Sequence, residues 1–142
     1  MIKNYLPDIK FIAVSDKMFH DSLSTFIYDD VIELKKIVYK DVNIGLSLHS
    51  YYVTISRKPS GNVSPAERIY FDQILSSLCR FVDYAYDLVE EIKPDMITIY
   101  NGRMFENRLF YEIAVKKGIA FESEEVYWRI NQPSIRVEYH GA

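Results

Sequence analysis

The longest regular pattern of apolar and polar positions begins after Ser64 and ends before Pro94. Serine, proline at the following position and Glu67 form a capping box with its preferred first helical residue. Apolar residues then recur at helical spacing, which predicts one helix of about 28 residues, roughly 42 Å long. Its predicted apolar stripe comprises Ile69, Ile74, Leu75, Leu78, Phe81, Val82, Ala85, Leu88, Val89 and Ile92.

A helix of this length exceeds what one sheet of a small domain can cover. We therefore expect part of its stripe, near Tyr70 and Phe71, to meet another domain or subunit, or the helix to bend. Cys79 lies within the stripe, so we expect it to fill the core and not to act as a nucleophile.

A second strong pattern follows Pro94-Asp95. Residues 96–100 form a continuous apolar run, which predicts a strand covered on both faces. Asn101 and Gly102 both tolerate the left-handed backbone of a sharp turn. A helix is predicted over residues 105–117, ended by Gly118. Its apolar positions are Leu109, Ile113 and Ala114.

After this helix, residues 119–121 predict a second short strand that ends in an acidic cluster, Glu122, Glu124 and Glu125. A strand–helix–strand crossover makes the two strands parallel, so Asn101-Gly102-Arg103 and the acidic cluster should converge on one edge. An amide, a guanidinium fork and carboxylates together suit a polyol that carries a phosphate. The alternative is that Arg103 or Arg108 simply pairs with these glutamates, which would contribute little to stability.

The remaining elements are shorter. A strand is predicted over residues 9–14, and a polar loop over residues 15–24. A helix should begin at Asp29 or Asp30, with Asp30 and Glu33 as a capping box, and run to about Tyr39. The face expected to be apolar carries Ile27, Val31, Leu34 and Val38.

Residues 43–45 are expected to break that helix. Residues 46–56 fit a strand or a helix, and we favour a helix, with a loop over residues 57–62. An edge strand is predicted over residues 135–139.

Composition sets further bounds. The 142 residues predict a single domain, 1–142, and the net charge of −3 with dispersed basic residues argues against nucleic acid as a partner. The longest apolar runs fall short of the roughly 20 residues that span a bilayer. A single cysteine excludes an intramolecular disulfide and fits a cytoplasmic location.

Catalytic signatures are scarce. The sequence contains no glycine-rich phosphate loop, nucleophile elbow or zinc spacing, so we expect no cofactor and no metal. His20, His49 and His140 are far apart in the sequence, and we expect ordinary packed or surface roles for them.

Together, several motifs resemble a known family. Pro94-Asp95 with its strand, Asn101-Gly102-Arg103, Arg108, Lys117-Gly118-Ile119 and a glutamate about seven residues on are similar to the amino-terminal half of bacterial capsular-polysaccharide and lipopolysaccharide glycosyltransferases of the two-Rossmann-domain (GT-B) type. The long helix with Leu75-Ser76-Ser77-Leu78 is similar too. The likeness covers residues 64–125.

The resemblance implies an α/β fold: a Rossmann-like three-layer domain with a mostly parallel sheet and one long helix. It implies an acceptor-side half that helps move a sugar from a nucleotide-sugar to a capsule, lipopolysaccharide or exopolysaccharide glycan. Substrate would contact residues of the cleft: Asn101, Gly102, Arg103, Arg108, Glu124 and Glu125. A general base is not assigned.

The chain also departs from the family pattern. A second Rossmann domain is absent, so it or another subunit would be needed as a partner, and we expect the isolated chain to transfer little sugar. The acidic cluster has Glu124-Glu125-Val126 where the family tends to place a glutamate, a basic residue and glycine. The sequence leaves open whether the natural protein continues beyond Ala142.

Two other classes of function stay open. One is a non-catalytic assembly module of a polysaccharide-synthesis complex, with the long helix forming a homodimer or docking on a membrane complex. The other is a small protein that binds a nucleotide or sugar phosphate, with Arg103 clamping the phosphate.

Overall fold

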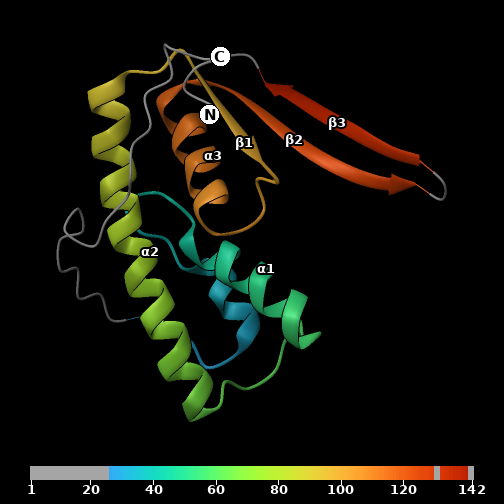
Figure 1. Cartoon of the computed structure of the whole chain (residues 1–142). Coiled ribbons are helices and arrows are strands. Elements are labelled where there is room, and N and C mark those ends of the chain that lie inside the picture. The colour runs from blue at the N-terminus through green and yellow to red at the C-terminus, as the bar shows by residue number, and fades with distance from the viewer. Residues whose placement is uncertain (1–25, 130–131, 141–142) are drawn as a thin grey trace, which may run out of the picture.

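The structure is a computed structural model that describes residues 26–129 and 132–140 (Figure 1). The described residues form a mixed α/β fold with one long helix, α2, and a parallel strand pair. The strand predicted at residues 9–14 and the loop containing His20 lie outside the described residues. In chain order the elements are η3 (Val31–Lys36), α1 (Ile44–Ser56), α2 (Pro65–Ile92), β1 (Met96–Tyr100), α3 (Phe105–Lys117), β2 (Ala120–Arg129) and β3 (Gln132–His140).

The prediction of α2 is confirmed, including its capping box. The main-chain N–H of Glu67 donates to Ser64 Oγ at 3.3 Å, and the Ser64 N–H donates to the Glu67 carboxylate at 2.9 Å. The helix ends at Ile92, and its C-cap Lys93 has left-handed backbone. Its buried side chains include Leu75, Leu78, Cys79, Val82, Ala85 and Val89, so the expected core role of the cysteine is confirmed.

The first turns of α2 correct one expectation. Phe71 was expected to meet another domain or subunit, but it is fully buried, with its ring edge-on to Tyr52 at 5.0 Å. Of the large apolar side chains there, Ile69 and Tyr70 are exposed, at 63% and 39%. The reason is that Tyr28 and α1 cover this end of α2, so another chain is not needed to bury Phe71.

η3 is shorter than the predicted helix and is a 3-10 helix. Its capping box is confirmed: the Asp30 carboxylate accepts from the Ile32 N–H at 2.8 Å, and Glu33 accepts from the Asp30 N–H at 3.2 Å. Val31 and Leu34 are buried, but Ile27 and Val38 are exposed, contrary to the predicted face. A 3-10 helix has three residues per turn and stops early, so those two positions fall outside it.

α1 confirms the helix predicted at residues 46–56 but begins two residues earlier. Asn43, predicted to break a helix, instead caps one, and its Oδ1 accepts from the Leu46 N–H at 2.9 Å. Gly45 lies inside α1, where a Cβ atom would come within 1.8 Å of the Leu34 carbonyl oxygen. The glycine therefore allows the start of α1 to touch η3.

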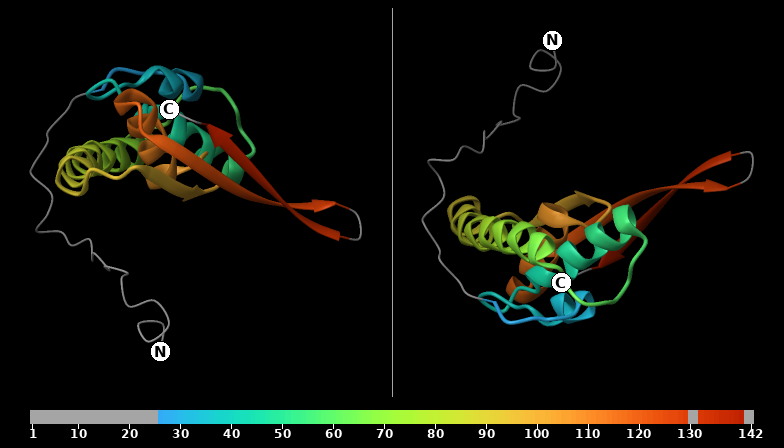
Figure 2. Two further views of the ribbon diagram at one scale, coloured as in Figure 1. Left: turned by 90° about the horizontal axis from the view of Figure 1, so that it is seen from above. Right: turned by 90° about the horizontal axis from the view of Figure 1, so that it is seen from below.

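The sheet has the order β1-β2-β3 in the described part of the chain. β1 and β2 are parallel, from Met96 opposite Ala120 to Tyr100 opposite Glu124, as predicted. β2 is longer than the predicted strand, because β3 pairs with it antiparallel along nearly its whole length. β3 includes the edge strand predicted at residues 135–139, and the β2–β3 ribbon projects away from the helices (Figures 1 and 2).

α3 covers one face of the parallel pair. The Tyr111 ring meets Phe121 edge-on at 4.8 Å, and Ile99 and Phe121 are buried. Alternate residues of β1, including Thr98 and Tyr100, are exposed. The prediction that this strand is covered on both faces is therefore wrong for the described structure, because helices pack on only one of those faces.

The core lies among the four helices. Its fully buried side chains come from η3, α1, α2 and α3, with the 42–44 segment between them. They include Leu34, Val42, Ile44, Leu48, Phe71, Leu75, Val82, Leu109 and Ile113. Of the described helices, none is both long enough and apolar enough to cross a bilayer.

Candidate functional site: the rim at the end of β1 and the start of α3

The turn after β1 is held against the neighbouring strand. Asn101 has a φ of 49°, and its main-chain N–H donates to the Glu124 carbonyl oxygen at 2.9 Å. The Arg103 N–H then donates to the Asn101 carbonyl oxygen at 2.6 Å, which closes the turn. The structure therefore brings the Asn101-Gly102-Arg103 turn and Glu124 to one edge of the sheet, where the parallel crossover was expected to place them.

Gly102 serves a different purpose from the one expected. Both turn residues tolerate left-handed backbone, and of the two Asn101 adopts it. A Cβ atom at Gly102 would lie 2.9 Å from Ile99 Cδ1 and 3.7 Å from Ser123 Oγ. Glycine is therefore favoured here by the close approach of the turn to the Ile99 side chain, not by its φ angle.

The two predicted arginines differ sharply. Arg103 is exposed at the tip of the turn. Arg108 lies one turn into α3, where its Nη2 contacts Glu112 Oε1 at 2.5 Å and its guanidinium stacks on the Tyr111 ring at 4.8 Å. The Arg108 side chain is thus paired within its own helix, away from the acidic cluster. Its Nε is buried without a hydrogen-bond partner among the described residues.

The predicted acidic cluster lies within β2. Glu124 is exposed and faces β1 in register with Tyr100. Glu125 is in β2 opposite Arg136, and its side chain lies outside what the structure describes. Of the predicted carboxylates, Glu124 is therefore the one that the structure fixes next to the turn.

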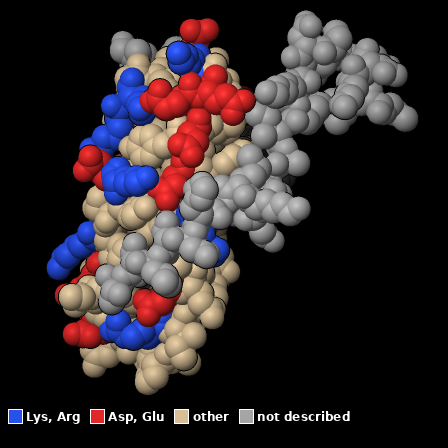
Figure 3. All heavy atoms as spheres, turned by 90° about the vertical axis from the view of Figure 1, so that its left-hand side faces the viewer, with Lys and Arg blue, Asp and Glu red and all other residues tan. Residues whose placement is uncertain are grey.

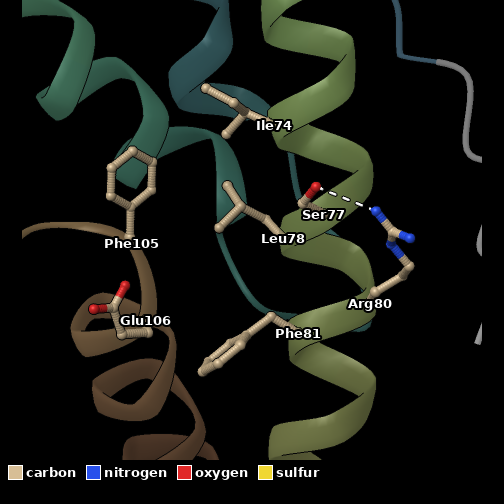
Figure 4. Close-up of a pocket in the computed structure, with 7 residues that line it drawn as sticks. All are labelled: Ile74, Ser77, Leu78, Arg80, Phe81, Phe105 and Glu106. Atoms are coloured by element: carbon tan, nitrogen blue, oxygen red, sulfur yellow. Dashed lines mark hydrogen bonds between the residues drawn. The ribbon is translucent and has the colours of Figure 1, made fainter. Parts of the chain in front are cut away.

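A cavity of about 480 Å³ opens between α2 and the start of α3 (Figure 4). α3 contributes Phe105 and Glu106, which lie across from Phe81 of α2. Arg80 points to the outer side of α2, where its Nη2 donates to Ser77 Oγ at 3.3 Å. The other lining residues are Ile74 and Leu78. The cavity therefore combines apolar and aromatic walls with one carboxylate.

Aromatic neighbours hold these walls in place. The Phe105 ring lies 4.6 Å from the Tyr51 ring of α1, and the Phe81 ring meets Phe110 edge-on at 5.6 Å. Because both rings are packed from behind, their positions are set before any ligand arrives.

Glu106 is the residue that sequence reasoning missed. It lines this cavity and a second one of about 410 Å³ beside β1. An acidic residue in a first helical turn is also ordinary stabilisation of the helix dipole, so its sequence position alone did not single it out. The available signal was its place three residues after Arg103, at a helix start where Met104 provides no side-chain cap.

Other candidate groups have structural roles. His49 is buried, and its Nε2 lies 3.0 Å from the Pro59 carbonyl oxygen, which links α1 to the 57–62 loop. His140 ends β3. Within the described ranges, His, Cys, Asp and Glu side chains do not gather in threes as a metal site would require.

On the side of the molecule shown in Figure 3, acidic and basic side chains share the surface, and the basic ones do not merge into one patch. One ion pair of this kind joins Lys117 of α3 to Glu90 of α2. No family model, curated protein or solved structure matches the chain. Its function must therefore be inferred from its own residues.

Proposed function

We propose that the chain is the acceptor-side domain of a bacterial glycosyltransferase that builds a capsule, lipopolysaccharide or exopolysaccharide glycan. The observation that carries the proposal is the Asn101-Gly102-Arg103 turn, held at the end of a parallel strand beside Glu124. In open α/β sheets, ligands bind where strands end and helices begin. The sequence resemblance of residues 64–125 points in the same direction.

The rim, formed by the Asn101-Gly102-Arg103 turn and the first turn of α3, offers suitable chemistry for a phosphorylated sugar. The Arg103 guanidinium is exposed and can form a bidentate contact with a phosphate. The cavity between α2 and the start of α3 presents Phe105 and Phe81 as apolar surfaces for a sugar ring, and the Glu106 carboxylate as an acceptor for hydroxyl groups. Asn101 Oδ1 is buried and has no partner among the described residues, so it too can accept a hydrogen bond.

The proposal includes a Rossmann-like three-layer fold. The parallel β1–β2 pair joined through α3 supports it, although the other described ladder, β2–β3, is antiparallel. In the proposal, a second Rossmann domain or another subunit supplies the nucleotide-sugar contacts. The protein then works in the cytoplasm, at the membrane where the glycan is assembled.

Binding to the rim can be tested on the full chain with glucose 1-phosphate and inorganic phosphate as probes. Backbone amide resonances of Asn101, Arg103 and Glu106 should shift on addition of glucose 1-phosphate, and Arg103→Ala should abolish the shifts. As a control, Lys116→Ala removes an exposed cation at the C-terminal end of α3 and should leave binding unchanged. A titration that leaves the rim resonances unmoved would contradict the proposal.

The two-domain part of the proposal has its own test. Incubated with nucleotide-sugars and glycan acceptors, the purified chain should transfer little or no sugar. Robust transfer would show that the chain alone forms a complete active site.

An assembly module is the second candidate. It is favoured by exposed apolar side chains near the junction of α1 and α2, namely Ile55, Ile69 and Tyr70. Light scattering after size exclusion separates the two: a stable monomer weakens the assembly function, and a dimer that Ile69→Ser dissociates supports it.

A further inference from the structure

The cavity beside β1 is a groove between the end of α2, β1 and α3. Its volume of about 410 Å³ lies within the range of small-molecule sites. Apolar side chains from all three elements supply most of its walls, among them Leu88, Ile92, Ile97 and Phe110. Of the described residues that line the groove, Glu106 is the one that carries a charge. The groove therefore combines a long apolar wall with one carboxylate.

The groove has a polar end and an apolar end. α3 runs back along β1, so its first turn lies beside the end of that strand (Figure 1). There Asn107 Nδ2 donates to the Tyr100 carbonyl oxygen at 2.6 Å, next to Glu106. Ile92 and Pro94, which lie between the last turn of α2 and the start of β1, form the opposite end. The two ends are separated by about the length of β1, roughly 13 Å.

The polar end offers hydrogen-bond acceptors. Within the described part of the chain, the Glu106 carboxylate has neither an ion pair nor a hydrogen bond. Asn107 uses its Nδ2 for the Tyr100 carbonyl, so its Oδ1 remains as a second acceptor. Arg108, the next cation along α3, pairs with Glu112 and is not among the groove residues. A group that donates hydrogen bonds and carries positive charge therefore suits this end best.

We propose that the groove binds a primary amine with an apolar tail, its ammonium group at Glu106 and its hydrocarbon along Phe110 and Ile92. A primary amine is protonated at neutral pH, as the lysine side chain is. Its three N–H donors can serve the carboxylate and the Asn107 amide oxygen together. The tail removes apolar surface of the groove from water, which supplies the larger share of the affinity. A fatty acid would instead place its carboxylate beside Glu106 and be repelled.

This inference goes beyond the proposed glycan site. It concerns walls away from Arg103 and Phe105, and Glu106 is the residue that the groove shares with the cavity described above. The alternative is that Glu106 only stabilises the dipole at the start of α3. A groove of that kind would bind apolar molecules without regard to their charge.

Three probes of equal chain length distinguish these possibilities on the full chain at pH 7: octylamine, octanol and octanoate. In NMR titrations, octylamine should shift the backbone amides of Ile97, Asn107 and Phe110. Its Kd should be about fivefold lower than that of octanol, which is the scale of an exposed ion pair. Octanoate should bind more weakly than octanol.

Two variants assign the effect to the two ends of the groove. Glu106→Gln removes the charge at nearly constant size and should abolish the preference for octylamine over octanol. The matched control, Asp95→Asn, removes an exposed carboxylate that precedes β1 and does not line the groove, so it should keep the preference. Ile92→Ser should weaken octylamine and octanol alike, by at least about threefold, and should leave glucose 1-phosphate binding at Arg103 unchanged.

Several results would overturn the proposal. The groove amides could stay unmoved by all three probes. Octanol or octanoate could bind as tightly as octylamine. The preference for octylamine could persist in Glu106→Gln, or vanish equally in Asp95→Asn. Glu106 and Ile92 are both exposed, so neither variant should disturb the core, and unchanged melting temperatures would verify this.

Discussion

The helical body, formed by η3, α1, α2 and α3, differs from the rim after β1 in how its polar and apolar groups are satisfied. In the body, Phe71 and Leu75 are fully buried, and the Tyr28 hydroxyl donates to Asp72 at 2.6 Å. At the rim, Asn101 holds a positive φ, and its Oδ1 is buried with no partner in the described structure. Strained backbone and unsatisfied polar atoms cost stability and gather where ligands bind. Positive φ also occurs in the body, at Lys40, Asp41, Arg57 and Lys93, so the buried Asn101 Oδ1 is the observation that sets the rim apart. In the proposed function, the body supplies stability and the rim contacts the ligand.

The largest expected effect is in the body. Leu75→Ala should lower the free energy of unfolding by about 2–5 kcal/mol, because it leaves a cavity in a close-packed core. Ile69→Ala, on the exposed side of the same helix, should change it by less than about 0.5 kcal/mol. Urea denaturation measures both. Equal effects would mean that the body is not packed as described.

Gly45→Ala should come next. Its new Cβ would collide with the Leu34 carbonyl oxygen, so α1 and η3 must move apart. Overpacking of this kind costs about 1–3 kcal/mol, which we expect as a lower unfolding midpoint in urea. A variant as stable as the native chain would show that α1 does not touch η3 at this point.

The α2 cap predicts a smaller effect that depends on pH. Hydrogen bonds from the Ser64 hydroxyl, Tyr52 and the Ser64 main chain lower the pKa of Glu67 from 4.5 to about 2. The stabilisation is therefore complete above pH 4.5 and is lost as pH falls toward 2.

Glu67→Gln should accordingly cost about 1 kcal/mol at pH 7, and the difference from the native chain should vanish near pH 2. Thermal unfolding at a series of pH values measures this. Glu33→Gln, the matching change in the η3 cap, provides a comparison. A pH-independent difference would contradict the assigned hydrogen bonds.

The smallest effect on stability is expected at the rim. Asn101→Gly should raise the free energy of unfolding by up to about 1 kcal/mol, because glycine tolerates the positive φ and the unpaired carbonyl is removed. Binding of glucose 1-phosphate should nevertheless weaken. Weaker binding combined with greater stability would sharpen the contrast between body and rim. A large loss of stability would place Asn101 with the body.

Local signals predicted much of the fold. The capping box at Ser64, the apolar run at 96–100 and Gly118 after α3 fix their elements, because each depends on chemistry within a few residues. The parallel pairing of β1 and β2 followed from the single crossover helix. These features need no knowledge of distant contacts.

Tertiary contacts decided what the sequence could not. Asn43 caps α1 instead of only ending the preceding helix, and Gly45 is set by contact with Leu34. β2 extends well past Phe121 because β3 pairs with it. At the site, Asn101 and Glu124 were placed correctly beside each other. Glu106 was missed because its importance comes from the cavity that α2 completes.

The uninterrupted length of α2 has a consequence for how the molecule unfolds. A single uninterrupted helix borders Tyr28 and α1 at its first turns and α3 at its last, where Lys117 pairs with Glu90. Melting either end would strip the other of its partner, so the body should denature in one all-or-none transition. A sugar captured at the rim would then raise the melting temperature of the distant η3 end as much as that of α3.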